Sequence, residues 1–586
     1  MIDHSLFTMT YSADIQTAPR QFLPQNFKLA DWETLKPYFD ELVQRPLNTK
    51  EDLERWLKDM SEVEAVLGED AAWRQIRMTC DTENKELEKA FEYFVLEIQP
   101  KIQPYADQLN RKLIDCPFTA QLDEKEYHTY LRNVRKSIEL FREANIPLQA
   151  ETAVLAQQYG VITGKMSIEV EGKEYTLQQA AKFLESHNRN LREEVYYKMQ
   201  NRRLQDKEQL NELYTTLVQK RDQMARNAGF ENYRDYRFAD LGRFDYTKED
   251  CFQFHEAVVT HVMSLVDFIY DRKRQKLGLE NLRPWDTEAE PKGVSPLRPF
   301  QTGDELINKT VECFDRMDPF FADCLRKMKE MDRFDLDSRK GKAPGGYNCP
   351  LEETGAPFIF MNAAGQMHDV TTMVHEGGHA IHSFLAHRLP LTAFKQYPME
   401  IAEVASMAME LMSMDYWDVY FDNPEDLQRA KEHQLERVIT IFPWIATIDK
   451  FQHWVYEHPA HTLEERGENW RRIMNEYTSI AIDVSGLEEY RKYSWQRQLH
   501  LFEVPFYYIE YGIAQLGAIG LWKQFKENKQ QTIENYTNAL SLGGTKTLPE
   551  LYEAAGLKFS FSPDYISELM LFVHKELEAV THPQHS

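Results

Sequence analysis

The stretch VHEGGHAIH, from Val374 to His382, contains three histidines, one glutamate and two adjacent glycines. His375 and His379 are four residues apart, so on a helix their side chains lie on one face, about 6 Å from each other. Two imidazoles so placed can bind one zinc ion, and Glu376 can take a proton from water that the ion activates. The pattern therefore predicts a helix that carries a catalytic metal site.

The adjacent glycines, Gly377 and Gly378, are unexpected there, because glycine costs a helix interior about 1 kcal/mol relative to alanine. The residues around them, such as Val374, Ile381 and Phe384, are apolar, so the helix is expected to be buried. A missing side chain lets another backbone approach closely. We therefore predict that the glycines give clearance to a neighbouring, ligand-bearing helix.

The third histidine, His382, lies seven residues after His375, about 10.5 Å along the helix axis. The two cannot both reach one ion, so His382 is predicted to pack beside the site. A metzincin would have a third histidine at the position of Leu385, so that class is excluded. Another pair, His255 and His261, lies on opposite faces and is typical of an ordinary amphipathic helix.

A third metal ligand is expected from a carboxylate on a second helix. The segment PMEIAEVASMAMELMSMDYW (398–417) favours a helix and carries Glu400, Glu403 and Glu410 among methionines and alanines. Acidic side chains on so apolar a helix are not expected to be solvated surface charges. Spacing alone does not choose the ligand among them. Ser406 and Glu410 could orient a ligating histidine.

The bulk composition limits the class of protein. The chain has 586 residues, too many for one core, and 12% of them are aromatic, which argues against disorder. Its formal net charge of −25 disfavours nucleic acids and anionic membranes as partners. The six cysteines show no C-x-x-C spacing, which indicates free thiols in a reducing compartment. With neither a signal peptide nor a transmembrane stretch expected, the predicted location is the cytoplasm.

Most of the chain shows the three- and four-residue apolar spacing of helices, notably in residues 31–60, 83–114, 124–145, 176–203 and 204–228. Residues 166–176 alternate around Gly172 and predict a β-hairpin. Residues 280–300 are rich in proline and predict a long surface loop. The expected division is an N-terminal helical lobe, 1–165, and a catalytic region with the metal site and C-terminal helices, 166–586.

Several stretches resemble the thimet-oligopeptidase and oligoendopeptidase F group of zinc metallopeptidases, especially its Pz-peptidase-like bacterial branch. They are HEGGHAIHS (375–383), EVASMAME (403–410), HLFEVPFYYIEYGIAQLGA (500–518) and SLGGTKTLPELYEAAGL (541–557), together with KGKAPGGY (340–347) and PFIFMN (357–362). The resemblance implies a mostly α fold: a two-lobed helical shell around a deep substrate channel, with a small β-sheet beside the HExxH helix. It also implies short peptides as substrates and one zinc ion per chain.

The resemblance assigns the third ligand to Glu403, the first glutamate of E-x-x-S-x-x-x-E. The implied ligand set is His375, His379 and Glu403, with Glu376 as the general base.

The segment after residue 500 supplies donors that could polarise a scissile carbonyl and stabilise an oxyanion. The family uses a histidine and tyrosines in this segment, which points to His500. Because Val504-Pro505 shifts the local context, Tyr508 and Tyr511 are chosen for this role, and Tyr507 is held in reserve as a substrate contact.

The run PFIFMN, with Phe358, Ile359 and Phe360, is predicted to be an edge strand that binds substrate backbone by β-addition. The glycine-rich stretch before it is expected to form a loop that could move over the cleft.

Together these patterns predict a zinc endopeptidase for short oligopeptides, acting as a monomer or small homo-oligomer. Two alternatives stay open. One is a zinc hydrolase that acts on larger proteins, and the other is a non-catalytic peptide-binding or scaffold protein with a degenerate metal site.

Overall fold

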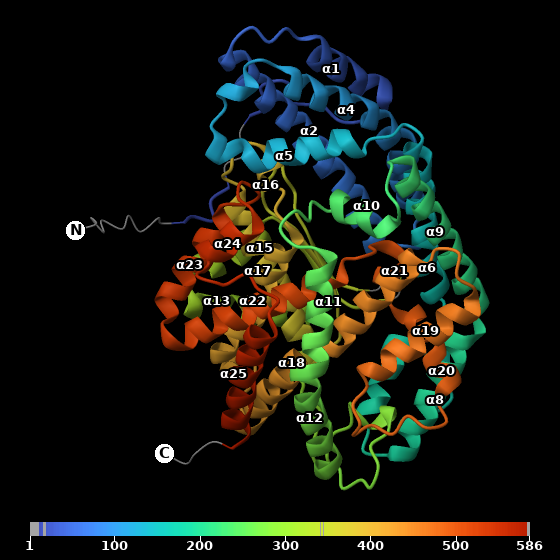
Figure 1. Ribbon diagram of the computed structural model, residues 1–586. Coiled ribbons are helices and arrows are strands. Elements are labelled where there is room, and N and C mark those ends of the chain that lie inside the picture. The colour runs from blue at the N-terminus through green and yellow to red at the C-terminus, as the bar shows by residue number, and fades with distance from the viewer. Residues whose placement is uncertain (1–10, 16–18, 340, 344, 583–586) are drawn as a thin grey trace.

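The computed structural model describes residues 11–15, 19–339, 341–343 and 345–582. Helices make up most of the fold, as the apolar spacing predicts (Figure 1). The predictions about the N-terminal residues 1–10 and about Lys340 and Pro344 of the glycine-rich stretch lie outside the described residues.

The first five α-helices are α1 (Trp32–Gln44), α2 (Lys50–Cys80), α3 (Lys85–Tyr93), α4 (Gln99–Asp115) and α5 (Glu124–Leu140). At one end of the molecule, α1, α2, α4 and α5 lie together (Figure 1) and share an apolar core of their own, to which α3 adds no buried residue. The predicted helix over 31–60 is two helices, because Pro46 cannot continue the first and Thr49 caps the second. Leu391 and Phe394 from the catalytic region join this core.

The predicted hairpin is confirmed. Strands β1 (Ser167–Val170) and β2 (Lys173–Thr176) pair antiparallel. Glu171 and Gly172 both have positive φ, as a two-residue turn of this twist requires. The helices around it and after it are α6 (Asn145–Thr163), α7 (Leu177–Ala181), α8 (Arg189–Gln205), α9 (Lys207–Asn227), α10 (Tyr233–Asp240), α11 (Lys248–Ala257) and α12 (Met263–Lys276).

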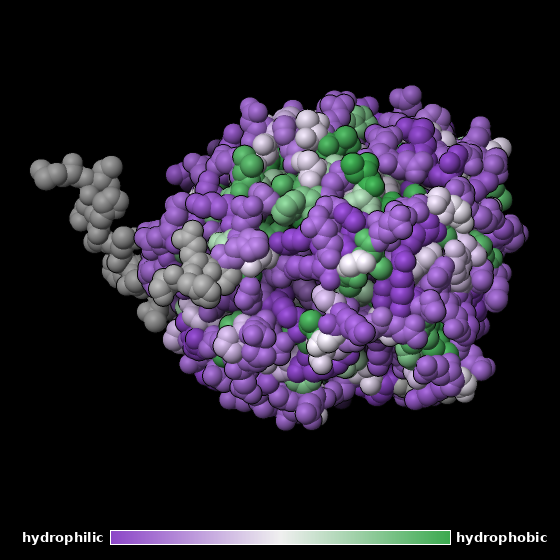
Figure 2. Space-filling model, turned by 90° about the horizontal axis from the view of Figure 1, so that it is seen from below, coloured by the Kyte–Doolittle hydropathy of each residue, from purple (hydrophilic) through white to green (hydrophobic). Residues whose placement is uncertain are grey.

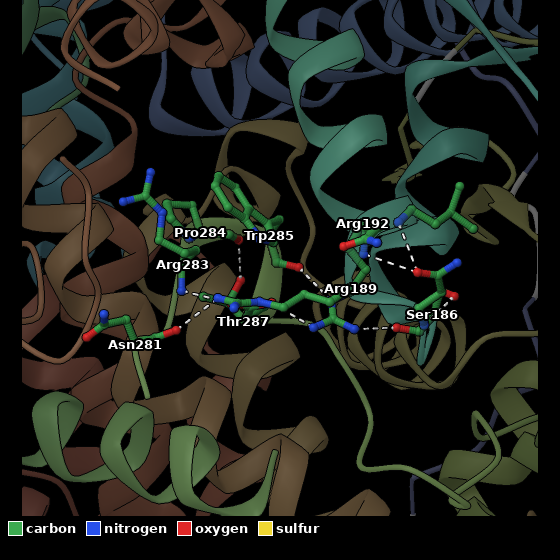
Figure 3. A network of polar contacts seen from close by, with 12 residues as sticks. Ser186, Arg189, Arg192, Asn281, Arg283, Pro284, Trp285 and Thr287 are labelled. Carbon is green, nitrogen blue, oxygen red and sulfur yellow. Dashed lines mark hydrogen bonds and ion pairs between the residues drawn. The ribbon is translucent and has the colours of Figure 1, made fainter. Parts of the chain in front are cut away.

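Residues 280–300 contain no long element, but the prediction of a surface loop is wrong for their central part. Asp286 is fully buried, and its carboxylate accepts hydrogen bonds from Arg189 at 2.8 Å and Arg192 at 2.6 Å, both on α8. Figure 3 shows these arginines turned toward the loop residues Asn281 to Thr287. Ion pairing thus fixes a segment whose composition suggested only solvent exposure.

A small mixed sheet leads into the HExxH helix. It contains β3 (Phe334–Asp337), β4 (Tyr347–Cys349) and β5 (Phe358–Ala363) in the order β3-β5-β4. Asp369 then accepts hydrogen bonds from the backbone N–H groups of Ala364 and Gln366, which starts α15 (Met367–Ala386). The sheet therefore sets where the HExxH helix begins.

The remaining helices form the larger part of the catalytic region. Helix α17 packs against both α15 and α22, near the middle of this region. They are α13 (Gly303–Met317), α14 (Pro319–Glu330), α16 (Thr392–Lys395), α17 (Met399–Met412), α18 (Pro424–Glu457), α19 (Leu463–Glu476), α20 (Glu488–Lys492), α21 (Leu499–Glu503), α22 (Tyr508–Glu527), α23 (Lys529–Ser541), α24 (Leu548–Ala554) and α25 (Pro563–Thr581).

Two large apolar clusters underlie the two-lobed architecture. The smaller lies mainly within residues 23–134, and the larger takes in side chains of α6 and most later helices. The division at residue 165 stays a prediction. Figure 2 shows one face covered mainly by hydrophilic residues. Within the described residues, no helix has the length and apolar character needed to span a membrane.

We predict that Asp286→Ala lowers the free energy of unfolding by about 3 kcal/mol, because Arg192 stays buried without its partner. The measurement is the shift of the thermal unfolding midpoint. Asp271→Ala is the matched control, since it removes an exposed ion pair with Arg274, worth less than about 1 kcal/mol. Equal effects of the two substitutions would contradict a structural role for Asp286.

Candidate metal and active site

The crossing of α15 and α17 explains Gly378, and the packing of α13 on α15 explains Gly377. A Cβ atom built on Gly378 would lie 2.5 Å from the carbonyl oxygen of Ala405 and 2.7 Å from Cα of Ser406. One built on Gly377 would lie 2.8 Å from the ring of Phe314 on α13. Such distances leave no room for a methyl group against backbone. The predicted clearance for a second helix is therefore confirmed at Gly378.

This close approach brings one glutamate of α17 to both histidines of α15. Glu403 Oε2 lies 3.4 Å from Nε2 of His375 and 3.6 Å from Nε2 of His379. One donor atom from each residue falls within 4.8 Å of the others. Two imidazole nitrogens and one carboxylate oxygen, with cavities beside them, are a donor set that fits catalytic zinc.

Each of these side chains is held by a second polar group. His375 Nδ1 lies 2.7 Å from Glu410 Oε1, while Gln434 donates to the other oxygen of Glu410. This contact is the one that the predicted orienting role of Glu410 requires. Ser406 instead donates to Glu403 Oε2 at 3.0 Å, so the prediction that it orients a histidine is wrong.

The hydroxyl of Tyr507 donates to Glu403 Oε1 at 2.6 Å. Burial opposes ionisation of Glu403, but His379, His375 and this hydroxyl outweigh it and hold its pKa at about 2. Tyr507 also lines a cavity. Its predicted contact with a substrate stays a prediction. Its hydroxyl, however, is engaged by the carboxylate.

Glu376 points into the cavities next to these donors. Its side chain is buried, and its Oε2 has no hydrogen-bond partner among the residues that the structure describes. Burial raises its pKa to about 7. A buried carboxylate that lines a cavity and has a raised pKa is suited to take up a proton near neutral pH.

His500, Tyr508 and Tyr511 line one cavity together with Glu376. Trp444 donates to Gln498 Oε1, which leaves the amide nitrogen of Gln498 to donate to His500 Nδ1 at 2.6 Å. The proton of His500 is thereby assigned to Nε2, which lies 3.4 Å from the hydroxyl of Tyr511. Burial lowers the pKa of His500 to about 4, so the ring is a neutral donor. Tyr508 packs edge-on against His500.

Two cavities meet at Glu376. One of about 230 Å³ extends past His500 and Tyr508, and one of about 500 Å³ extends along β4 and past Tyr507. His375, Glu376 and Tyr511 line both. The candidate site therefore has room for a chain on each side of the reacting groups.

The prediction of PFIFMN as a substrate-binding edge strand is wrong. Strand β5 is paired on both edges, and Phe358, Ile359 and Phe360 are buried in the core. Among the described residues the edge strands are β3 and β4, and Tyr347 and Asn348 of β4 line the larger cavity. Asn348 also donates to the backbone oxygen of Glu376 at 3.4 Å.

His382 is fully buried and stacks on Tyr397, with 3.5 Å between ring centroids. Neither of its nitrogens has a hydrogen-bond partner among the described residues. Its packing role is confirmed, and it stands outside the group formed by His375, His379 and Glu403.

Sequence reasoning missed Gln434, Gln498 and Asn348. Gln434 carries no local signal, because its partner Glu410 lies on a different helix. Gln498 lies two residues before His500, so its position next to that histidine was a local signal. Asn348 could have been found, since it follows the glycine-rich turn in a short strand of its own.

A mostly helical chain with an HExxH helix beside a small sheet has the architecture of a class of metallopeptidases. Residues 182–571 match the family model of peptidase family M3, and residues 22–141 match the peptidase M3 N-terminal domain. The chain belongs to peptidase family M3. The predicted resemblance to the oligoendopeptidase F group is thereby confirmed.

Individual relatives agree with this. An oligoendopeptidase F homolog of Borreliella burgdorferi is 22% identical over 528 residues, which is 85% of each chain. The solved structure of PZ peptidase A with an inhibitor is 27% identical, with a TM-score of 0.90 over 94% of this chain and 98% of that one. A putative oligoendopeptidase F from Bacillus anthracis is 25% identical, with a TM-score of 0.85 over 96% and 99%.

We predict that Gly378→Ala destabilises the protein by about 1–3 kcal/mol and weakens metal binding, because α17 must move away from α15. Thermal unfolding and metal titration measure the two effects. Gly160→Ala on α6 is the matched control, since a Cβ there meets nothing within 4 Å. It should be neutral or stabilising. A stabilising effect at both positions would contradict the clearance role.

Proposed function

We propose that this chain is a zinc-dependent endopeptidase that hydrolyses internal bonds of short peptides in the cytoplasm. The observation that carries the proposal is the meeting of two cavities at Glu376, directly beside His375, His379 and Glu403. A site open on both sides accommodates residues before and after the scissile bond.

In this proposal, His375, His379 and Glu403 hold one zinc ion per chain. When bound, zinc lowers the pKa of water to about 7 and polarises a carbonyl group. Glu410, Ser406 and Tyr507 fix the ligands through the hydrogen bonds described above, which limits reorganisation of the site during the reaction.

Glu376 is the proposed general base and acid. Its carboxylate accepts a proton from the attacking water and then delivers it to the nitrogen of the leaving amine. The raised pKa supports this double role, since a group with pKa near 7 both accepts and returns a proton at neutral pH.

His500 and Tyr511 are the proposed oxyanion donors. Nε2–H of His500 and the hydroxyl of Tyr511 lie close together beside Glu376, where a carbonyl oxygen gains charge. Neutral, preorganised donors in a buried site stabilise such charge strongly. Tyr508, predicted as a donor together with Tyr511, packs edge-on against His500 and lines the same cavity, so its hydroxyl is kept as a second proposed donor.

The free edge of β4 is the proposed place where substrate backbone binds. It replaces β5 in that role, because its edge is unpaired within the described residues and its Tyr347 and Asn348 line the larger cavity. Main-chain hydrogen bonds at this edge would bind peptides of many different sequences, and pockets for their side chains would determine which peptides are preferred.

A length series tests the proposed substrate class. Peptides blocked at both ends, of increasing length up to an unfolded protein, are incubated with the zinc-loaded enzyme and the products are analysed by mass spectrometry. We expect internal cleavage of short peptides and a sharp loss of rate above a size limit. Equal cleavage of the unfolded protein would favour a protease for larger substrates, and binding without turnover would favour a non-catalytic protein.

We predict that Glu376→Gln lowers kcat/KM by about 10³-fold without changing the zinc content, because the base is lost and the ligands are not. A chelator should abolish activity of the unmodified enzyme, and zinc should restore it. Glu410→Gln is the matched control, with zinc affinity reduced about 10-fold or more. Activity that survives both Glu376→Gln and the chelator would overturn the mechanism.

We predict different defects for two neighbouring tyrosines. Tyr511→Phe should lower kcat by about 10²-fold with zinc affinity unchanged, because it removes an oxyanion donor. Tyr507→Phe should weaken zinc binding by about 10-fold, with activity recovered in excess zinc, because it frees Glu403. Steady-state kinetics at several zinc concentrations separate the two. Identical zinc dependence would contradict this assignment of roles.

A further inference from the structure

A second group of metal-ligand side chains lies between α11 and α18. Cys251 and His255 are four residues apart on α11, and Asp449 and His453 are four residues apart on α18. All four are buried, with at most 2% of each residue exposed. Each pair therefore lies on one helix face, and the two faces meet.

The donor atoms in this group converge. One atom each from Cys251, Asp449 and His453 lies within 4.8 Å of the others. His255 Nε2 forms a hydrogen bond of 2.8 Å to Asp449 Oδ2. His453 Nε2 lies 3.2 Å from the same oxygen, at ion-pair distance but without hydrogen-bond geometry. His255 thus holds one oxygen of Asp449 and leaves the other free.

The polar atoms that remain are unpartnered. Asp449 Oδ1 and both ring nitrogens of His453 have no hydrogen-bond partner among the described residues. Within that part of the chain, no lysine or arginine forms an ion pair with Asp449 either. Phe238, Phe252 and Phe506 pack around His453. Leaving a carboxylate oxygen and an imidazole unpaired in such surroundings is costly.

We propose that Cys251, Asp449 and His453 form a second zinc site, which is structural and separate from the site at His375. A thiolate and a carboxylate together carry two negative charges, so bound Zn²⁺ makes the buried group neutral. Sulfur, nitrogen and oxygen donors suit zinc. Binding releases the thiol proton of Cys251. His255 fixes Asp449 from outside, as partners of metal ligands commonly do.

The location gives the site a structural consequence. The ring of His453 packs on Phe506, with centroids 5.3 Å apart, and the side chain of Gln452 accepts from the backbone N–H of Phe506. Phe506 has a φ of 66°, an unusual value for a residue with a large side chain. Phe506 directly precedes Tyr507, whose hydroxyl donates a hydrogen bond to Glu403. A metal that joins α11 to α18 therefore steadies the segment that carries Tyr507.

Cobalt substitution tests this proposal separately from catalysis, since only the proposed site contains sulfur. The metal-free full-length protein is titrated with Co²⁺, and bound metal per chain and thiolate-to-cobalt charge-transfer absorption are measured. We expect two ions per chain and a thiolate band. His379→Ala should leave one ion with the band intact, whereas Cys251→Ala should leave one ion without it.

Two further variants distinguish loss of the metal ligand from a general loss of folded protein. Cys251→Ser keeps the size of the side chain and should abolish the band. Cys313→Ala, at another fully buried cysteine, should retain both ions and the band. One ion per chain and no band in the unmodified protein would overturn the proposal and leave a metal-free His-Asp-His cluster. A band that persists in Cys251→Ser would also overturn it.

Discussion

The close contact between α15 and α17 is the constraint on which the rest of the site depends. Gly378 has no side chain, so the backbone at Ala405 and Ser406 can approach within a distance that a methyl group would forbid. Glu403, two residues before Ala405, is thereby placed beside His375 and His379. Helix packing at ordinary separation, about 8–10 Å between axes, would hold that carboxylate farther away. Both glycines weaken the isolated helix, and Gly378 makes the close pair of α15 and α17 possible.

Burial then determines how the charged side chains behave. Glu403 and Glu410 sit in the core, where an unpaired carboxylate is unfavourable, so each is paired or hydrogen-bonded on both oxygens. Glu376 is the exception, with one free oxygen and a raised pKa. The contrast follows from geometry rather than residue type, and it separates the groups that hold the site from the one free to exchange a proton.

Local patterns predicted the helices, the hairpin and the His375/His379 pair, because each depends on residues close in sequence. The choice of Glu403 over Glu400 and Glu410 required the family resemblance, since all three lie on one apolar helix. The error at β5 is instructive: Phe358, Ile359 and Phe360 form a continuous apolar run, which is typical of a strand covered on both faces. The partners Gln434 and Asp286 could not be predicted, because their contacts join segments far apart in the chain.

The protein thus contains two groups of donors built by the same means, with one helix supplying donors and a second helix packed against it. Around His375, His379 and Glu403, cavities on both sides keep the donors accessible to a substrate. Around Cys251, Asp449 and His453, phenylalanine rings close the surroundings instead. In the two proposals, this difference in access separates a site that turns over substrate from one that stabilises the fold. Phe506 packs against His453, and the adjacent Tyr507 donates to Glu403. A change in packing around His453 is therefore expected to alter the position of Tyr507 beside Glu403.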